Sequence, residues 1–199
     1  MSFANLKLVY LLLCVGLGLL ILSPTLVSVV ALPSGERFSE IWMLGPNHVA
    51  EDYPFNVREN EPYLVYLDVG NHLGISAYYV LNVKFRNQNE PLPNATTGLA
   101  SPLASLYEYR LFVADNASGE VPLTFQFSRV SFSGGNVFVG DLIVNGVSFP
   151  VGETVSWDAD KSGYYFQLFV ELWIYNSASD GFSYSNRFVS RWVNMTVSL

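Results

Sequence analysis

Three oxygen-bearing side chains at alternate positions form the pattern in this sequence that comes nearest to a metal site. Asp158, Asp160 and Ser162 precede Gly163, which matches the spacing and the turn glycine with which a calcium loop begins. The twelfth position, where a bidentate carboxylate is expected, is Phe169. A hairpin turn rich in Asp and Ser uses the same residues. We therefore keep these three side chains only as weak calcium candidates, and we predict no metal site and no cofactor.

The only two histidines, His48 and His72, each follow an asparagine in a turn-like segment. With Glu51 or Asp52 they could supply two imidazoles and a carboxylate to zinc. Nothing in their spacing requires them to meet, and a histidine in a turn more often holds its own loop by hydrogen bonding. We expect a structural role for both.

Nucleophilic catalysis finds little support in the residue pattern. The sequence contains no G-x-S-x-G motif, and its single cysteine, Cys14, lies in an apolar segment. Glu108 and Glu171 lie on predicted strands and could form the carboxylate pair of a glycosidase. Any all-β domain with seventeen acidic residues offers such pairs, so we predict a protein that is not an enzyme.

Three sequons could carry N-linked glycans: Asn94-Ala95-Thr96, Asn116-Ala117-Ser118 and Asn194-Met195-Thr196. Glycosylation requires this tripeptide on accessible backbone of an exported chain. Asn94 and Asn116 fall in predicted loops, whereas Asn194 falls in a predicted strand. We expect all three as candidate acceptors, with Asn194 the least favourable.

These residues are carried by short β-rich runs separated by turn residues, with no amphipathic helix between them. The runs predict eight or nine strands and a two-sheet sandwich, and the aromatic run Tyr164–Asn176 is typical of a central strand buried on both faces. We expect a hairpin at Gly70–Gly74, a two-residue turn at Asn145-Gly146, and an exposed loop over Asn87–Ser105. The strands are expected at Phe38–Leu44, Tyr63–Val69, Ser76–Arg86, Tyr107–Ala114, Leu123–Phe132, Val137–Val144, Thr154–Trp157, Tyr164–Asn176 and Arg187–Val197. The four tryptophans are expected in the core: Trp42, Trp157, Trp173 and Trp192.

An uncharged stretch, Leu8–Leu32, precedes the strands. As a helix it would span about 37 Å, enough to cross a hydrocarbon core of about 30 Å. Lys7 before it predicts a cytoplasmic N-terminus at residues 1–7, followed by the anchor at 8–32, a linker at 33–37 and an extracytoplasmic domain at 38–199. The alternative is a signal peptide cleaved after Ala31. Either segment directs the domain out of the cytoplasm.

Three segments carry a family resemblance. Phe38–Asn47, followed by Glu51–Val57 and Gly70-Asn71-His72, resembles an archaeal family of membrane proteins of unknown function, over roughly residues 30–90. The resemblance implies an extracytoplasmic immunoglobulin-like sandwich similar to adhesion-type modules of archaeal cell surfaces, and a retained membrane helix. The chain departs from the family at Asn60-Glu61, where Gly-Glu is usual. The resemblance implies no chemistry.

Charge narrows the choice of partners. Beyond Pro33 nine basic residues face seventeen acidic ones, a formal net charge of −8, so nucleic acid is disfavoured. We expect a non-enzymatic module anchored in the cell membrane that contacts lipid through residues 8–32 and binds other envelope or membrane proteins. The alternatives are a carbohydrate-binding or carbohydrate-processing domain that takes glycans, and a pilin-like structural subunit.

Overall fold

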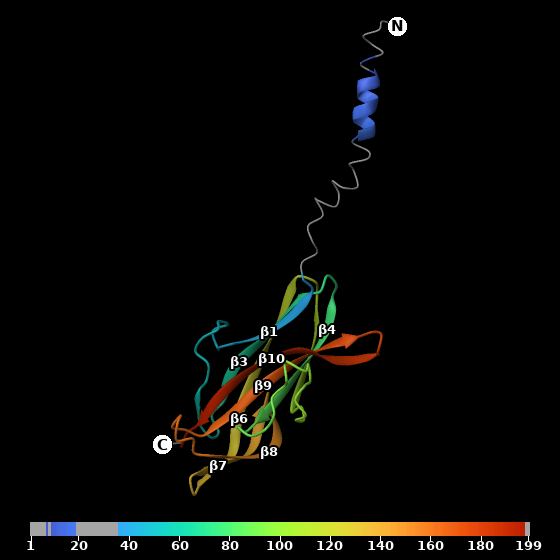
Figure 1. Cartoon of the computed structure of the whole chain (residues 1–199). Helices are drawn as coiled ribbons and strands as arrows, with labels where there is room; N and C mark the ends of the chain where they lie inside the picture. Colours follow the sequence, from blue (N-terminus) through green and yellow to red (C-terminus); the bar gives the residue numbers. More distant parts are fainter. Residues whose placement is uncertain (1–6, 8, 19–35, 198–199) are drawn as a thin grey trace. The chain divides into compact units, whose positions relative to one another are not determined.

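The computed structural model describes residues 7, 9–18 and 36–197. The chain divides into two compact units, Met1–Arg37 and Phe38–Leu199, which are considered separately. Residues 7 and 9–18 are helical (Figure 1). Across the parts of the chain that are described, no helix is both long enough and apolar enough to traverse a bilayer. Most of the expected anchor Leu8–Leu32, and the alternative cleavage site at Ala31, lie outside the described residues.

Ten strands form two five-stranded sheets in the described part of the second unit. The first sheet, sheet A, has the order β1 (Phe38–Leu44), β3 (Tyr63–His72), β6 (Ala117–Ser133), β7 (Asn136–Val144) and β8 (Val147–Ser156). The second, sheet B, has the order β2 (Asn56–Val57), β10 (Gly181–Met195), β9 (Tyr165–Asn176), β4 (Ala77–Arg86) and β5 (Tyr107–Val113). All pairs are antiparallel except β2 with β10. The expected all-β, two-sheet architecture is confirmed, with ten strands in place of eight or nine.

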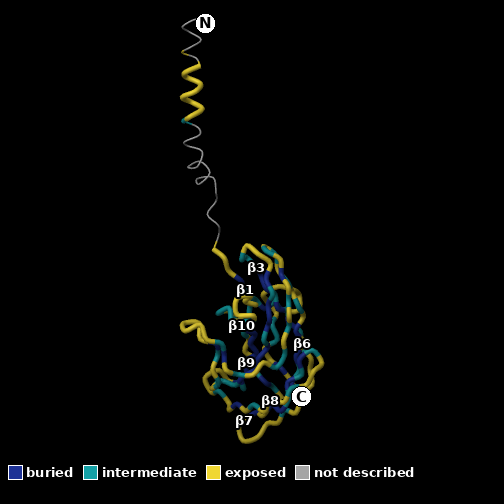
Figure 2. Tube along the Cα trace, turned by 90° about the vertical axis from the view of Figure 1, so that its right-hand side faces the viewer, coloured by how far each residue is buried: buried dark blue, intermediate teal, exposed yellow. Residues whose placement is uncertain are grey.

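The core lies between the two sheets. It is built from aliphatic and Phe side chains of both, and the rings of Phe85 in β4 and Phe127 in β6 meet across the layer at 5.7 Å. Figure 2 shows buried positions running along the strands while the turns at their ends are exposed. The inward side chains alternate with outward ones as the pleat requires.

Several local predictions are confirmed. β1 spans Phe38–Leu44 as expected, and the β7–β8 hairpin turns at Asn145-Gly146. Both turn residues have positive φ, 49° and 80°, the geometry in which asparagine followed by glycine is favoured. β9 lies in the middle of sheet B, and eight consecutive residues from Tyr165 are buried, so this strand is indeed covered on both faces.

The predicted hairpin at Gly70–Gly74 is wrong. β3 belongs to sheet A and β4 to sheet B, so the connection crosses from one layer to the other. The fully buried Asn71 holds this crossing: its Nδ2 donates to the carbonyls of Ile75 (2.8 Å) and Val113 (2.9 Å). Removing this amide from its site would break two hydrogen bonds to the backbone. Asn71 therefore stabilises the crossing from β3 in sheet A to β4 in sheet B.

The segment between β4 and β5 is only partly the exposed loop that was expected. Pro93 and Ser101 are buried, and the longest exposed run is the tip at residues 94–99. The backbone of Ser101 is tied to sheet B through Lys84 and Glu171. The loop therefore covers the outward face of the sheet.

Candidate functional site

An aromatic pocket of about 360 Å³ opens on the outward face of sheet B, at the end of the sheet where β2 pairs with β10. Phe55, Lys161, Tyr165 and Trp192 line it. Tyr165 is almost fully buried and forms the floor, whereas Phe55 and Trp192 are 49% and 36% exposed. The rings of Phe55 and Tyr165 lie 6.1 Å apart.

Asn194 holds the strands that carry these rings. Its Nδ2 donates to Asn56 Oδ1 on β2 (3.0 Å), and its Oδ1 accepts the backbone N–H of Tyr164 (2.9 Å). The N–H of Asn194 also donates to the carbonyl of Phe55 (2.7 Å). One side chain and its backbone thus join three segments, β2, β10 and the start of β9, and set the spacing of the aromatic rings.

The hairpin before β9 places Lys161 at the pocket. Asp158 and Gly163 close it as an antiparallel bridge, and the Tyr165 hydroxyl donates to the carbonyl of Lys161 (2.6 Å). The Lys161 ammonium lies 5.9 Å from the ring centroids of both Tyr165 and Trp192. Such a position over aromatic faces stabilises a cation electrostatically.

Arg86 lies beside the pocket and is itself only 7% exposed. Its guanidinium is 5.3 Å from the centroid of Trp192, and its Nε donates to Gln167 Oε1 (2.7 Å). Gln167 in turn donates to Ser190 Oγ (2.9 Å), so the amide is held in place. Burial lowers the pKa of Arg86, while the charge of Glu90 opposes that shift.

The expectation that the four tryptophans fill the core is wrong. Trp42 and Trp173 are half-buried, and Trp157 and Trp192 are exposed by 50% and 36%. The register explains Trp192, which stands opposite Gln167, a position on the outward face. Val, Leu and Phe residues occupy the space between the sheets.

The calcium candidates serve as turn residues. Asp158 Oδ1 accepts the backbone N–H groups of Asp160 (3.1 Å) and Lys161 (3.0 Å), and its other oxygen lies 3.6 Å from the Lys161 ammonium. Ser162 has a positive φ of 56° at the hairpin tip. Among the residues that the structure describes, no three acidic, His or Cys side chains are placed to hold a metal ion.

The two histidines do not meet. His48 stacks on Tyr66 at 3.9 Å and contacts Glu120 through Nδ1 (2.7 Å), whereas His72 contacts Glu40 through Nε2 (3.0 Å). Tyr66 and His72 are six residues apart on β3, which separates the imidazoles by about 20 Å. The imidazole of His48 thus contacts a carboxylate on β6, and that of His72 contacts a carboxylate on β1. Among the described residues, neither ring is held by its own loop.

The carboxylates Glu108 and Glu171 lie in one row across sheet B, each opposite Asn82 on the strand between them. Two strand spacings separate them by about 10 Å. Glu171 is fully buried, and its Oε2 lies 2.9 Å from the ammonium of Lys84. The loop residue Ser101 covers the pair, donating its N–H to Glu171 (2.7 Å) and accepting from Lys84 (2.8 Å).

Trp173 completes this cluster by donating its Nε1 to Glu171 Oε2 (3.0 Å). Glu108 is exposed and contacts Arg110 at 3.4 Å. One carboxylate is thus enclosed and fully engaged while the other faces solvent, an arrangement that stabilises the loop over the sheet rather than flanking a scissile bond.

The sequons differ in their surroundings. Asn94 is exposed and caps its turn, accepting the N–H groups two and three residues later. Asn116 is exposed at a positive φ of 56°, with Nδ2 donating to Asp115. Asn194 lies inside β10, and its amide is engaged with Asn56.

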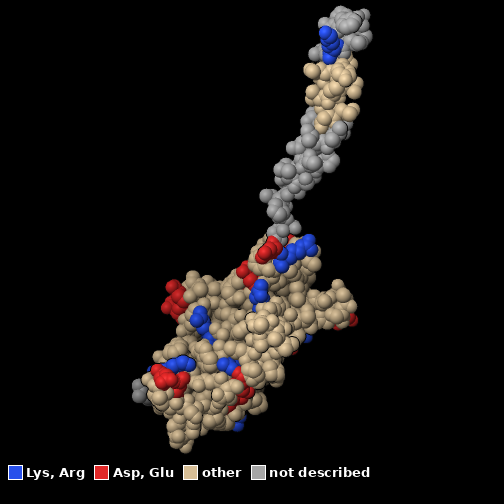
Figure 3. Space-filling model, viewed as in Figure 1, with Lys and Arg blue, Asp and Glu red and all other residues tan. Residues whose placement is uncertain are grey.

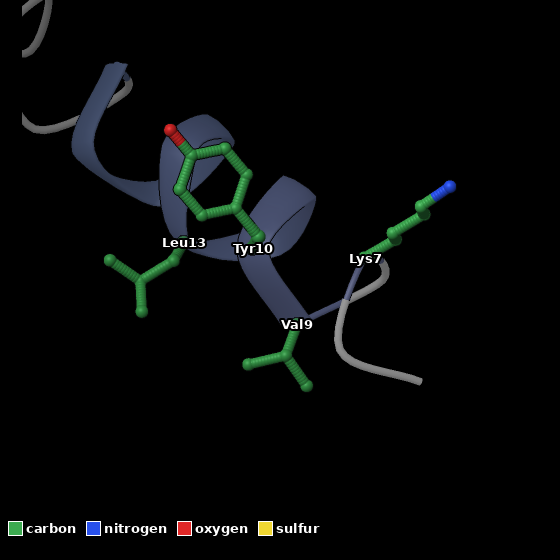
Figure 4. A pocket seen from close by; sticks show the side chains of 4 residues that line it. All are labelled: Lys7, Val9, Tyr10 and Leu13. Atoms are coloured by element: carbon green, nitrogen blue, oxygen red, sulfur yellow. The ribbon is translucent and has the colours of Figure 1, made fainter. Parts of the chain in front are cut away.

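Two further surfaces do not combine aromatic rings from several segments as the pocket on sheet B does. Four side chains that project from the N-terminal helix border an open hollow on its surface (Figure 4): Lys7, Val9, Tyr10 and Leu13. All four come from one helix, and Tyr10 is 74% exposed. Figure 3 shows acidic and basic side chains interspersed in small groups over the visible face of the second unit.

The residues around the pocket were not identified as site residues from the sequence. Trp192 alone was singled out, and its side chain was expected in the core. Phe55 precedes a two-residue strand, and Arg86 ends β4. The one available signal was the alternation of side chains along β9. Tyr165 and Gln167 share one face of the strand, and the apolar residues Phe166, Leu168, Val170 and Leu172 share the other. Nothing in the sequence indicated that β2 would pair with β10.

Comparison with solved structures finds distant likenesses. A β-glucosidase from Listeria innocua in complex with isofagomine is similar at 9% identity and a TM-score of 0.42, over 81% of this chain and 16% of that one. The complex between Zinc 2-glycoprotein and Prolactin inducible protein from human seminal plasma gives 10% identity and 0.37, over 82% and 98%. Spo0M, a sporulation control protein from Bacillus subtilis, gives 10% and 0.36, over 79% and 49%. These likenesses are too distant to indicate a function.

No curated protein matches the sequence. A family model does match, over residues 32–135, which are 104 of the 199 residues. Phe55 and Arg86 lie inside this range, and Lys161, Tyr165 and Trp192 lie beyond it. The chain belongs to the family described as Domain of unknown function (DUF1616).

Proposed function

We propose that the chain is a non-enzymatic surface module whose β-domain binds carbohydrate through the aromatic pocket. The observation that carries this proposal is the geometry of Phe55, Tyr165 and Trp192, three rings from three segments around one opening. Aromatic rings bind the C–H faces of sugars, and a few polar groups at the rim fix the orientation. Two exposed rings over a buried floor provide such a surface.

The state of the acidic side chains supports a binding role over hydrolysis. Glu171 is enclosed against Lys84 and accepts two further hydrogen bonds, so it is not free to transfer a proton or attack a sugar. Glu108 stands about 10 Å away and contacts Arg110. Neither carboxylate lines the aromatic pocket.

We further propose that Leu8–Leu32 anchors the chain in the cell membrane with the N-terminus in the cytoplasm and the domain outside, as an immunoglobulin-like module of an archaeal envelope. The uncharged run of twenty-five residues supports this. The intact mass of the protein extracted from its native membrane tests it. The mass should include residues 1–31, and a mass that begins after Ala31 would refute retention.

Glycan binding to the full chain in detergent micelles tests the pocket. Trp192→Ala should abolish binding on a glycan array, because it removes a ring at the opening. Trp157→Ala is the matched control, since Trp157 is also exposed and packs on Tyr164 outside the pocket. Loss of binding in both variants, or in neither, would contradict the proposal.

A second candidate function is contact with a protein partner at the free edge of sheet B. Phe112 on the edge strand β5 is 74% exposed, and nearby Ile75 is 66% exposed. An edge strand with an exposed aromatic side chain can accept a further strand from a partner. A photo-crosslinking residue at position 112 should give a discrete adduct in native membranes, and one at position 138, also an exposed Phe in a strand, should not. Equal labelling from both positions would reject this candidate.

A further inference from the structure

We infer that the aromatic pocket selects an acidic sugar, one that carries a carboxylate or sulfate, over a neutral sugar of the same size. This rests on the proposed function, because it names the substrate class of the same pocket. The juxtaposition behind it is that of two cations, Lys161 and Arg86, at the single ring of Trp192, 5.9 and 5.3 Å from its centroid.

The positive charge of Lys161 and Arg86 is opposite in sign to the net charge of the domain. Nine basic residues face seventeen acidic ones beyond Pro33, so an anion approaching the domain meets a repulsive average field. Two of the nine cations nevertheless converge on one ring of the pocket. These two cations would attract an anion at the pocket, although the net charge of the domain repels anions elsewhere.

Arg86 is built into the fold in the manner of a ligand-binding arginine. It is 7% exposed, and its Nε is held by Gln167, which is held by Ser190. Among the described residues Arg86 forms no ion pair, and its two terminal nitrogens have no hydrogen-bond acceptor there. Glu90 is the acidic residue whose charge reaches it, and that carboxylate accepts the N–H of Asn87. A fixed guanidinium with unused donors matches the geometry of a carboxylate or sulfate.

Lys161 differs from Arg86 in being exposed to solvent. Its side chain is 66% exposed, and Asp158 contacts it at the long distance of 3.6 Å. A carboxylate of the ligand can therefore take over this ammonium without breaking a short ion pair. A sugar stacked on Trp192 would present its acidic group between an exposed cation, Lys161, and a buried one, Arg86.

The test uses the full chain in nonionic micelles and an array that pairs hexuronate-containing, sialylated and sulfated oligosaccharides with their neutral counterparts. Acidic members should bind about tenfold more tightly or better than the neutral ones, since a charge-assisted hydrogen bond is worth at least that factor. The preference should weaken as salt is raised. Lys161→Met should reduce the binding of acidic sugars toward the level of the neutral ones.

Two further variants separate the pocket from general charge. Arg86→Lys keeps the cation but loses the planar fork, so acidic binding should fall while the thermal midpoint reports whether the domain stays folded. Arg187→Met removes one exposed cation from β10 outside the pocket and should change nothing. Equal loss in Arg187→Met and Lys161→Met would overturn the inference.

The outcomes distinguish the inference from the function on which it rests. Neutral and acidic sugars bound equally tightly, both lost in Trp192→Ala, would overturn acidic selectivity and leave carbohydrate binding standing. Binding of neither class would overturn both.

Discussion

The enclosed pair of Lys84 and Glu171 is predicted to be the most sensitive polar contact in the domain. Glu171→Gln leaves the buried ammonium of Lys84 with only the carbonyl of Ser101 as a close partner. Removing one member of a buried ion pair costs about 3–5 kcal/mol, because the other charge remains without compensation. Lys84→Met should cost a similar amount for the same reason.

The double variant should lose less than either single variant. Lys84→Met combined with Glu171→Gln removes both charges while the Gln oxygen still accepts one of the two donors, the N–H of Ser101 or the Nε1 of Trp173. The remaining cost is one unpaired donor, about 1–3 kcal/mol, together with the Ser101 carbonyl that Lys84→Met leaves unpaired in the single variant as well. The pair should therefore show a strong favourable coupling in a double-mutant cycle.

Urea unfolding of the full chain in nonionic detergent, followed by tryptophan fluorescence, measures these differences. With a slope of about 2 kcal/mol per molar urea, the single variants should shift the midpoint by about 1.5–2.5 M. The matched control is Glu108→Gln on the same face of the sheet, whose exposed contact with Arg110 should be worth less than about 1 kcal/mol. A midpoint for Glu171→Gln no lower than that of Glu108→Gln would refute the reasoning, as would additivity in the double variant.

Three further predictions concern other parts of the domain. Burial, and to a lesser extent the charge of Glu120, raises the pKa of Asp68, so the ionised form of Asp68 destabilises the fold at neutral pH. Asp68→Asn should therefore raise the urea midpoint at pH 7. The difference between the two proteins should vanish as the pH falls below 3.8, where Asp68 is protonated in both the folded and the unfolded state. Peptide mapping of the protein from a glycosylating host should find glycan on Asn94 and Asn116, and glycan on neither would contradict their assignment as accessible acceptors. Gly163→Ala should lower the thermal midpoint by several degrees, because a Cβ there would collide with Asn194 Oδ1 and lie 2.8 Å from the Tyr165 ring, and an unchanged midpoint would show that the hairpin yields without cost.

The local features of the fold followed from the sequence. Positive φ at Asn145 and Gly146 is a property of those two residues. The strand β9 has aromatic or aliphatic residues at both odd and even positions, which predicts cover on both of its faces. The side-chain period of two then fixes which residues share a face. Each of these inferences depends on neighbours within a dozen residues.

What could not be predicted depends on which strands pair across the chain. Gly70–Gly74 has the composition of a hairpin turn, and only the partners of β3 and β4 reveal that the chain crosses between layers there. The aromatic pocket has the same origin, because Phe55 and Trp192 meet only when β2 pairs with β10. Alternation placed Trp192 on a face without indicating whether that face is the inner or the outer one.

The pairing of β2 and β10 also governs when the domain can fold. Asn56 and Asn194, 138 residues apart, are neighbours in sheet B, and β10, the last strand along the chain, lies inside the sheet between β2 and β9. A chain that is still being synthesised cannot complete this sheet, since the position between β2 and β9 stays empty until β10 arrives. The sheet can close only after β10 has been synthesised, and such long-range pairing makes folding slow. Before β10 pairs, one edge of β9 has no partner strand, and in that interval the nascent protein most needs protection from aggregation.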